Sequence, residues 1–311
     1  MHARETASTN LNTAPVAVIV PVADRPRLVC EALDSIVQGR IQPREIVIVL
    51  NASVASGRDA DRYAVQDWIA ERSARLHPDV QCRHTDCDRQ GPAAARNRGA
   101  ALIQQPWLAF LDSDDLWHPE KLARQLVYLK QRPHLNVCHT REVWQKAGCV
   151  LTQPIRLRPR TGRFLTAAMQ TCLISCSAVL MRTALFHELN GFDEDYFVCE
   201  DFEFWLRLLH RMPVGLVDEA LTIKRSGDWP QLSQNHSLDY NRVRALLKFW
   251  QNHDLSAQER AEALRSMRAK LDILLSGARQ HENGEHHRRI AALEDRFRAI
   301  TGQVEVNNVG V

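Results

Sequence analysis

The sequence predicts an α/β fold with a mostly parallel sheet, followed by an α-helical extension. Residues 16–20 and 46–50 are continuous apolar runs rich in β-branched residues, as expected for strands that are covered on both faces. A helical pattern separates the two runs, so the chain opens with a β-α-β unit. From about residue 236 onward the strand signals stop, and apolar residues recur at helical spacing.

The alternation of strands and helices continues through the first part of the chain. In the first helix Asp24 is the expected N-cap, Pro26 lies near the first turn, and Gly39 ends the helix. The further predicted elements are a helix over 59–76, a strand over 80–85, a helix over 92–104, a strand over 107–111, a helix over 119–131 and a strand over 173–181. This order predicts helices packed against a central sheet.

The last part of the chain predicts three helices, the second of which opens with a capping box at Ser256 and Glu259. The predicted division is a flexible tail over 1–14, an α/β domain over 15–235, a helical extension over 236–302 and a flexible tail over 303–311. We expect the helices to pack back on the α/β domain or on a second copy of the chain, as a homo-oligomer. The basic face over 288–298 is interpreted as a solvated surface, with peripheral contact to a membrane as the alternative.

Composition excludes several classes of protein. The 311 residues include 40 Lys and Arg against 37 Asp and Glu, a balance that lacks the basic excess of nucleic-acid binders. No apolar run approaches the roughly 18 to 20 residues that span a bilayer, and the polar start lacks the core of a secretory signal. We expect a cytoplasmic protein, at most peripheral at the inner face of the membrane, with its eight cysteines reduced and mostly buried.

Three carboxylates crowd the end of the apolar strand over 107–111. Asp112, Asp114 and Asp115 lie within four residues of one another, and like charges at this spacing repel unless a cation lies among them. Oxygen ligands suit Mg²⁺ or Mn²⁺, which usually also bind substrate phosphates. The alternative is a helix N-terminus that carries favourable acids before Pro119. Three acids behind a buried strand favour the metal.

Two further segments carry candidate functional residues. A Gly91-Pro92 turn enters an alanine-rich helix in which Arg96 brings positive charge near the helix start, a suitable place for a diphosphate. Farther along, Glu200 and Asp201 begin an apolar helix that contains Trp205. The acids are interpreted either as a first-turn charge preference or as a general base in a crevice, with the indole ring as a platform for a sugar.

These motifs together resemble the family 2 glycosyltransferases of GT-A fold, over roughly residues 15–233. The matching segments are Pro21-Val22, Glu45 through Val49, Gly91 through Gly99, Phe110 through Trp117, Gly191 through Glu194 and Glu200 through Arg207. The resemblance implies an inverting, metal-dependent glycosyltransferase of hexosyltransferase type that uses a nucleotide-diphospho-sugar and Mg²⁺ or Mn²⁺. It also implies a role in bacterial-type glycan or polysaccharide biosynthesis, with a glycan, a lipid-linked precursor or a small glycoside as acceptor.

The resemblance also implies a role for individual residues. Asp201 would be the catalytic base. Donor-binding residues would be Pro21, Val22, Asn51, Gly91, Arg96 and Asp112; acceptor-binding residues would be Gly191, Glu200 and Trp205; metal ligands would be Asp114, Asp112 and Asp228. Asp228 stands where one bacterial branch of the family has His, and either side chain can ligate a metal.

One departure from the family concerns the end of the second strand. Where the family usually has Asp-Asp-Gly-Ser, this chain has Leu50-Asn51-Ala52-Ser53. An Asn carbonyl can accept a hydrogen bond from a base N–H but carries no charge. Two other functions therefore stay open: a non-catalytic sugar-nucleotide-binding protein, which the retained aspartates disfavour, and a nucleotidyltransferase. The latter should have a Gly-rich loop after the first strand, whereas residues 21–26 contain no glycine.

Overall fold

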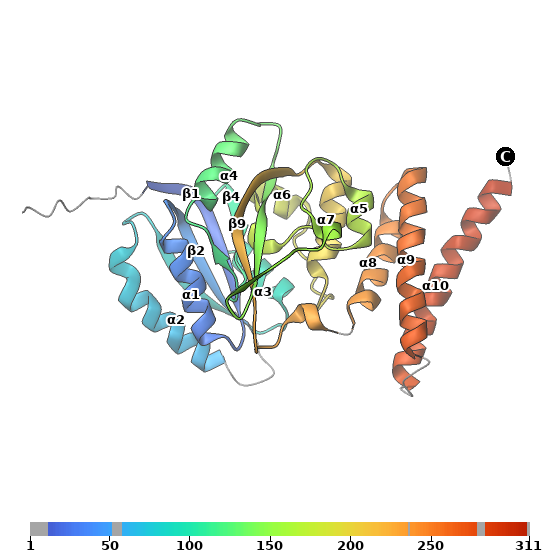
Figure 1. The fold of residues 1–311 in the computed structure, drawn as a ribbon, viewed down its shortest axis with the longest axis horizontal. Coiled ribbons are helices and arrows are strands. Elements are labelled where there is room, and N and C mark those ends of the chain that lie inside the picture. Colours follow the sequence, from blue (N-terminus) through green and yellow to red (C-terminus); the bar gives the residue numbers. More distant parts are fainter. Residues whose placement is uncertain (1–11, 52–57, 236, 279–283, 310–311) are drawn as a thin grey trace, which may run out of the picture.

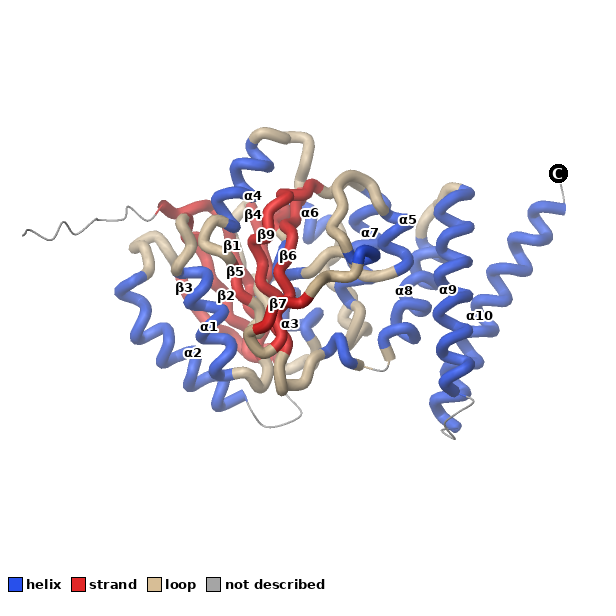
Figure 2. Tube along the Cα trace, in the orientation of Figure 1, coloured by secondary structure: helices blue, strands red, loops and turns tan. Residues whose placement is uncertain are grey.

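The computed structural model describes residues 12–51, 58–235, 237–278 and 284–309 (Figure 1). Ala52 and Ser53, part of the family comparison above, lie outside these residues. A twisted sheet stands between two layers of helices, as Figure 2 shows with the strands in red. Side chains alternate along the first strand: Ile19 contributes to the core on one face of the sheet and Val18 to the core on the other. Both faces are therefore buried, which explains the continuous apolar runs.

The sheet has the strand order β3-β2-β1-β4-β8-β6-β9-β5, and β7 pairs with β6 beside this path. The strands are β1 (Asn12–Val22), β2 (Ile41–Asn51), β3 (Gln81–Cys87), β4 (Trp107–Phe110), β5 (Leu116–Trp117), β6 (Val137–Lys146), β7 (Cys149–Leu151), β8 (Leu180–Arg182) and β9 (Gly215–Ser226). The first four pair in parallel, and β8 joins β4 antiparallel. The predicted parallel sheet is thus confirmed for its N-terminal half, and the second half is mixed.

Helices on the two faces come from different parts of the chain. The helices are α1 (Pro26–Val37), α2 (Arg58–Arg72), α3 (Pro92–Ala100), α4 (Lys121–Lys130), α5 (Leu165–Gln170), α6 (Thr183–Glu188), α7 (Glu200–Arg211), α8 (Leu238–Asn252), α9 (Ala257–Ala278) and α10 (Gly284–Val309). Buried residues of α1, α2 and α4 belong to one core, and those of α3 and α5 to α10 belong to the other. Close contact of α3 with the sheet requires small residues, because a Cβ on Gly99 would lie 2.6 Å from Ile19.

Two local predictions were wrong. Asp24 does not cap α1, because its φ of 57° places it in the left-handed region and the capping position is Arg25. The carboxylate of Asp61 instead accepts the backbone N–H groups of both residues, at 2.7 and 2.8 Å. The predicted strand over 173–181 is mostly irregular and 3₁₀-helical, and only Leu180–Arg182 forms a strand.

The C-terminal helices pack on the α/β domain and stand side by side at one end of the molecule (Figure 1). Val243 of α8, Met267 of α9 and Phe297 of α10 belong to the same core as α5 and α7. The capping box is confirmed, since the Ser256 N–H donates to the Glu259 carboxylate at 2.8 Å. The last helix ends at Val309, beyond the expected boundary near residue 302. None of the helices in the described ranges has the length and apolar character that crossing a bilayer requires.

Candidate active site

A cavity of about 850 Å³ opens at the carboxyl ends of β1, β2 and β4. Parallel strands place their carboxyl ends at the same edge of a sheet, where ligand crevices form in open α/β folds. Nine of the candidate residues line this cavity: Pro21, Val22, Asn51, Gly91, Arg96, Asp112, Asp114, Glu200 and Asp201. The structure therefore brings together segments that are as much as 180 residues apart (21 to 201).

Arg96 of α3 connects the two sides of the cavity. Its guanidinium donates to Asp112 and to Glu200, each at 2.6 Å. Burial alone would raise the pKa of Asp112, but the positive charges of Arg96 and Lys224 outweigh it and lower the pKa to about 2. Burial and the neighbouring Asp201 raise the pKa of Glu200 to about 7, against the opposing charge of Arg96. One buried cation thus holds a carboxylate from each half of the site.

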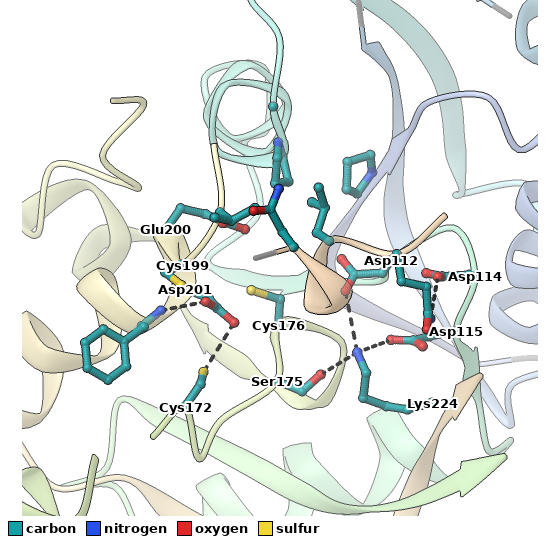
Figure 3. A pocket seen from close by; sticks show the side chains of 18 of the residues that line it. Asp112, Asp114, Asp115, Cys172, Ser175, Cys176, Cys199, Glu200, Asp201 and Lys224 are labelled. Carbon is teal, nitrogen blue, oxygen red and sulfur yellow. Dashed lines mark hydrogen bonds and ion pairs between the residues drawn. The ribbon is translucent and has the colours of Figure 1, made fainter. Parts of the chain in front are cut away.

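The other two acids of the cluster also have cationic partners. Asp114 pairs with Arg25 at 3.0 Å and accepts a hydrogen bond from Trp229 at 3.2 Å. Asp115 is buried and pairs with Lys224 at 2.8 Å, as Figure 3 shows. Burial nevertheless raises the pKa of Asp115 to about 6, with the charges of the two neighbouring aspartates acting in the same direction. The chain itself therefore compensates much of the repulsion within the cluster.

Two carboxylate oxygens of the acidic cluster accept no hydrogen bond from a described residue. They are Oδ2 of Asp112, which faces the Lys224 ammonium at 3.7 Å, and Oδ1 of Asp114. The hydrogen-bond donors to each carboxylate use its other oxygen. Mg²⁺ is commonly held by one or two carboxylates together with substrate phosphates. Asp228 is exposed and does not line the cavity, so the structure does not place it with these ligands. The described residues contain no group of three His, Cys, Asp or Glu side chains arranged for a metal.

Asp201 lies in the first turn of α7 and reaches the cavity from the side opposite the cluster (Figure 3). The turn begins at Cys199, whose φ of 67° is left-handed. One carboxylate oxygen of Asp201 accepts the N–H of Phe202 at 2.7 Å, and the other accepts the thiol of Cys172 at 3.3 Å. Both oxygens are therefore oriented, and the helix N-terminus favours the negative charge.

Asn51 has a structural task that the sequence analysis did not anticipate. Its side-chain oxygen accepts the Gly91 N–H and its amide donates to the Arg89 carbonyl, both at 2.9 Å. Gly91 has a φ of 105°, which favours glycine. Asn51 thus joins the end of β2 to the turn before α3, and a hydrogen bond to a nucleotide base could use only the remaining lone pair of its oxygen.

Two expected acceptor contacts are absent from the described cavity. The Trp205 side chain is in the core, with the residue 2% exposed, and packs edge-on against Phe204 at 5.0 Å between ring centroids. Trp205 lies one helical turn beyond Asp201, in a part of α7 that is buried in the core. Its ring therefore cannot contact a sugar in the cavity. Gly191 is needed for the backbone: its φ is 62°, and a Cβ there would lie 2.6 Å from the amide oxygen of Asn97.

Sequence reasoning missed three side chains that act on the site. Arg25 and Lys224 pair with the acidic cluster, and Cys172 donates to Asp201. Period-two alternation along β9 places Lys224 on the same face as the buried Thr222, which was a usable signal. Nothing local in the sequence points to Cys172, because its loop approaches α7 only in the folded chain.

Comparison with solved structures identifies the fold. Staphylococcus aureus TarS 1–349 in complex with UDP-GlcNAc has a TM-score of 0.67 at 18% identity, over 91% of this chain and 80% of that one. The mannosyltransferase PcManGT of Pyrobaculum calidifontis, in complex with GDP-Man and Mn²⁺, has a TM-score of 0.53 at 17% identity, over 94% and 89%. The chain has the GT-A fold of these glycosyltransferases.

Sequence comparison then identifies the family. A family model described as glycosyl transferase family 2 matches residues 17–189, more than half of the chain, and the protein belongs to this family. An uncharacterized glycosyltransferase of Rickettsia conorii is 28% identical over 214 residues, which is 68% of this chain and 33% of that protein. The chain thus spans about a third of the length of this relative.

Proposed function

We propose that the protein is an inverting glycosyltransferase that moves a sugar from a nucleotide-diphospho-sugar to an acceptor hydroxyl. The observation that carries the proposal is the arrangement of one cavity, in which Asp201 faces the Asp112 cluster and Arg96 connects their two sides. Inversion by a single displacement needs a base on the side of the sugar opposite the leaving group. Opposed walls of this kind provide that separation.

The donor side would be the wall built by β1, β2, α3 and the acidic cluster. TarS is described with UDP-GlcNAc and PcManGT with GDP-Man, so a nucleotide-diphospho-sugar is the ligand class that the fold comparison supports. Asp112 and Asp114 would hold Mg²⁺ or Mn²⁺, which would neutralise the charge of the diphosphate. Arg25 and Lys224 have side chains that are 20% and 33% exposed, whereas that of Arg96 is 5% exposed. We therefore assign phosphate contact to the first two and give Arg96 the task of orienting carboxylates.

The chemical step would be one displacement at the anomeric carbon. Asp201 accepts the proton of the acceptor hydroxyl as that oxygen forms its bond to the sugar, and the bond to the diphosphate oxygen breaks. The electron pair of the broken bond leaves with the nucleoside diphosphate. The hydrogen bonds from Cys172 and from the Phe202 N–H hold the Asp201 carboxylate in one orientation during proton transfer.

Substitution of the base tests the proposal. In the presence of Mn²⁺ or Mg²⁺, we expect calorimetry to show binding of a UDP-, GDP- or dTDP-sugar to the protein. We also expect the protein to hydrolyse one of these nucleotide-sugars slowly when no acceptor is present. Asp201→Asn should lower kcat for that hydrolysis by about two to four orders of magnitude and leave donor Kd unchanged. The matched control is Asp195→Asn, at an exposed carboxylate. Donor binding without turnover under any of these conditions would favour a non-catalytic protein, and a higher donor Kd with intact kcat would make Asp201 a binding residue.

A further inference from the structure

The edge strand β7 lies beside the mouth of the cavity. It pairs antiparallel with β6, and Leu151 is directly opposite Trp144. Opposite residues of an antiparallel pair share a face of the sheet. Because Trp144 lines the cavity, Leu151 lies on the cavity side of the edge. We call residues 149–160, which comprise β7 and the 3₁₀ turn after it, the rim segment.

Exposed apolar side chains follow one another along this segment. Leu151 is 41% exposed and Ile155 is 75% exposed, whereas Leu157, two residues on, lines the cavity and packs on the core. Phe197 and Leu232, from other segments of the chain, also line the cavity and are exposed. Large apolar side chains exposed together at the mouth of a cavity indicate a surface that binds a protein, a membrane or an apolar ligand.

The same segment is strongly basic. From Val143 to Arg163 the chain has no Asp or Glu, and its cationic residues are Lys146, Arg156, Arg158, Arg160 and Arg163. Arg156 and Arg158 flank Leu157 and are exposed, and neither forms an ion pair with a carboxylate in the described part of the chain. The cationic groups are therefore available to an external anion.

We propose that the rim segment docks the cavity mouth on an anionic phospholipid bilayer, so that the acceptor is a lipid-linked saccharide presented at that surface. The acceptor class rests on the proposed function, whereas the docking does not. Arginine side chains bind anionic headgroups, and the apolar side chains between them enter the boundary between headgroups and acyl chains. A soluble anionic polymer would satisfy the arginines but leave Leu151 and Ile155 exposed to water, so the bilayer fits both observations.

Vesicle binding by the full chain tests the docking. We expect the protein to sediment with vesicles of phosphatidylcholine and phosphatidylglycerol, and not with phosphatidylcholine alone. Arg156→Glu together with Arg158→Glu should weaken binding by at least about 30-fold, since each arginine near an anionic surface contributes roughly a factor of five and each glutamate adds repulsion. Leu151→Ser together with Ile155→Ser should weaken it at least about fivefold with no change of charge. Thermal unfolding and nucleotide affinity should stay unchanged, because these side chains are exposed.

The matched control reverses charge on the last helix, with Arg288→Glu and Arg296→Glu on α10. These changes should leave vesicle binding within about twofold. Loss of binding in this control, with the rim variants unaffected, would move the docking surface to α10 and overturn the proposal. Binding that depends on the arginines but not on Leu151 and Ile155, and that a soluble polyanion abolishes, would overturn the bilayer in favour of an anionic polymer. Because the assay needs no turnover, its outcome is independent of Asp201 and of the proposed reaction.

Discussion

Replacing Arg96 by Met should reveal how much of the folding free energy depends on the link between the two halves of the site. Met retains much of the apolar stem but removes the charge from both ion pairs, each of which has an N···O distance of 2.6 Å. Glu200 is then left buried beside Asp201, and Asp112 loses its closest cation. Uncompensated buried carboxylates of this kind cost far more than a missing surface ion pair.

The magnitude follows from the burial of the partners. Removing one member of a buried pair costs about 3 to 5 kcal/mol, and here one cation serves two carboxylates. The cost should also depend on pH. Burial raises the pKa of Glu200 from 4.5 to about 7 in the folded protein, so its ionisation destabilises the fold as pH rises through this interval. Without Arg96 the pKa of Glu200 rises further, and the difference from wild type should widen between pH 6 and pH 8.

Urea unfolding at several pH values measures this effect. Arg98→Met is the matched control, since Arg98 is an exposed arginine on the same helix, and it should change the free energy of unfolding by no more than about 0.5 kcal/mol. Adding Glu200→Gln to Arg96→Met should restore part of the lost stability. The reasoning fails if Arg96→Met costs no more than the control, or if the difference narrows as pH rises.

Three further predictions concern the metal, a buried histidine and the C-terminal helices. Asp114→Asn should reduce nucleotide affinity in Mn²⁺ to the value that wild type shows in chelator, by calorimetry; equal wild-type affinity in both conditions would contradict the metal assignment. Burial lowers the pKa of His139 from 6.5 to about 4, so only the unfolded chain takes up the proton between these values. Stability should fall by about 2 kcal/mol from pH 7 to pH 5 in urea unfolding, and this part of the pH dependence should disappear in His139→Gln. Deleting residues 238–311 should expose the apolar faces of α5 and α7 against which α9 and α8 pack, and cause aggregation in light scattering; a monomeric, fully folded product would refute the packing argument.

The sequence predicts the central sheet well because burial on both faces leaves a strong local signal. The short apolar runs in β1 and β2, rich in β-branched residues, are typical of strands buried on both faces. The acids after β4 lie at the edge of the sheet where the parallel strands end. The strand predicted over 173–181 was too long, since only Leu180–Arg182 is a strand. Apolar residues in a buried irregular segment have the same sequence pattern as a buried strand. The local sequence pattern predicts that these residues are buried, but it does not predict the backbone conformation in which they are buried.

The site residues were predictable where a motif places them at the end of a strand or helix. They were not predictable where their role depends on how deeply the side chain is buried. Asp112, Asp114 and Asp201 all lie in the cavity. Trp205 does not lie in the cavity. Helical spacing predicts the direction of its side chain around α7, but it does not predict whether that turn of the helix is buried. Asp228 fails for a related reason: beyond the end of β9 no pairing fixes which side chain turns inward, and Trp229 rather than Asp228 reaches Asp114.

The two walls of the cavity have different origins in the chain, and this has an evolutionary consequence. The wall with the acidic cluster comes mostly from residues before 116, with Lys224 of β9 added to it, whereas the opposite wall uses Cys172, Leu173 and Asp201 together with Leu238 and Arg242 of α8. Under the proposed function, substitutions in the second group would change the acceptor that is glycosylated, while the sugar-nucleotide side would keep its residues. Since α8 itself contributes to that wall, a chimera that exchanges acceptor preference between relatives must carry α8 and the helices packed on it, and a junction placed near residue 230 would divide the wall in two.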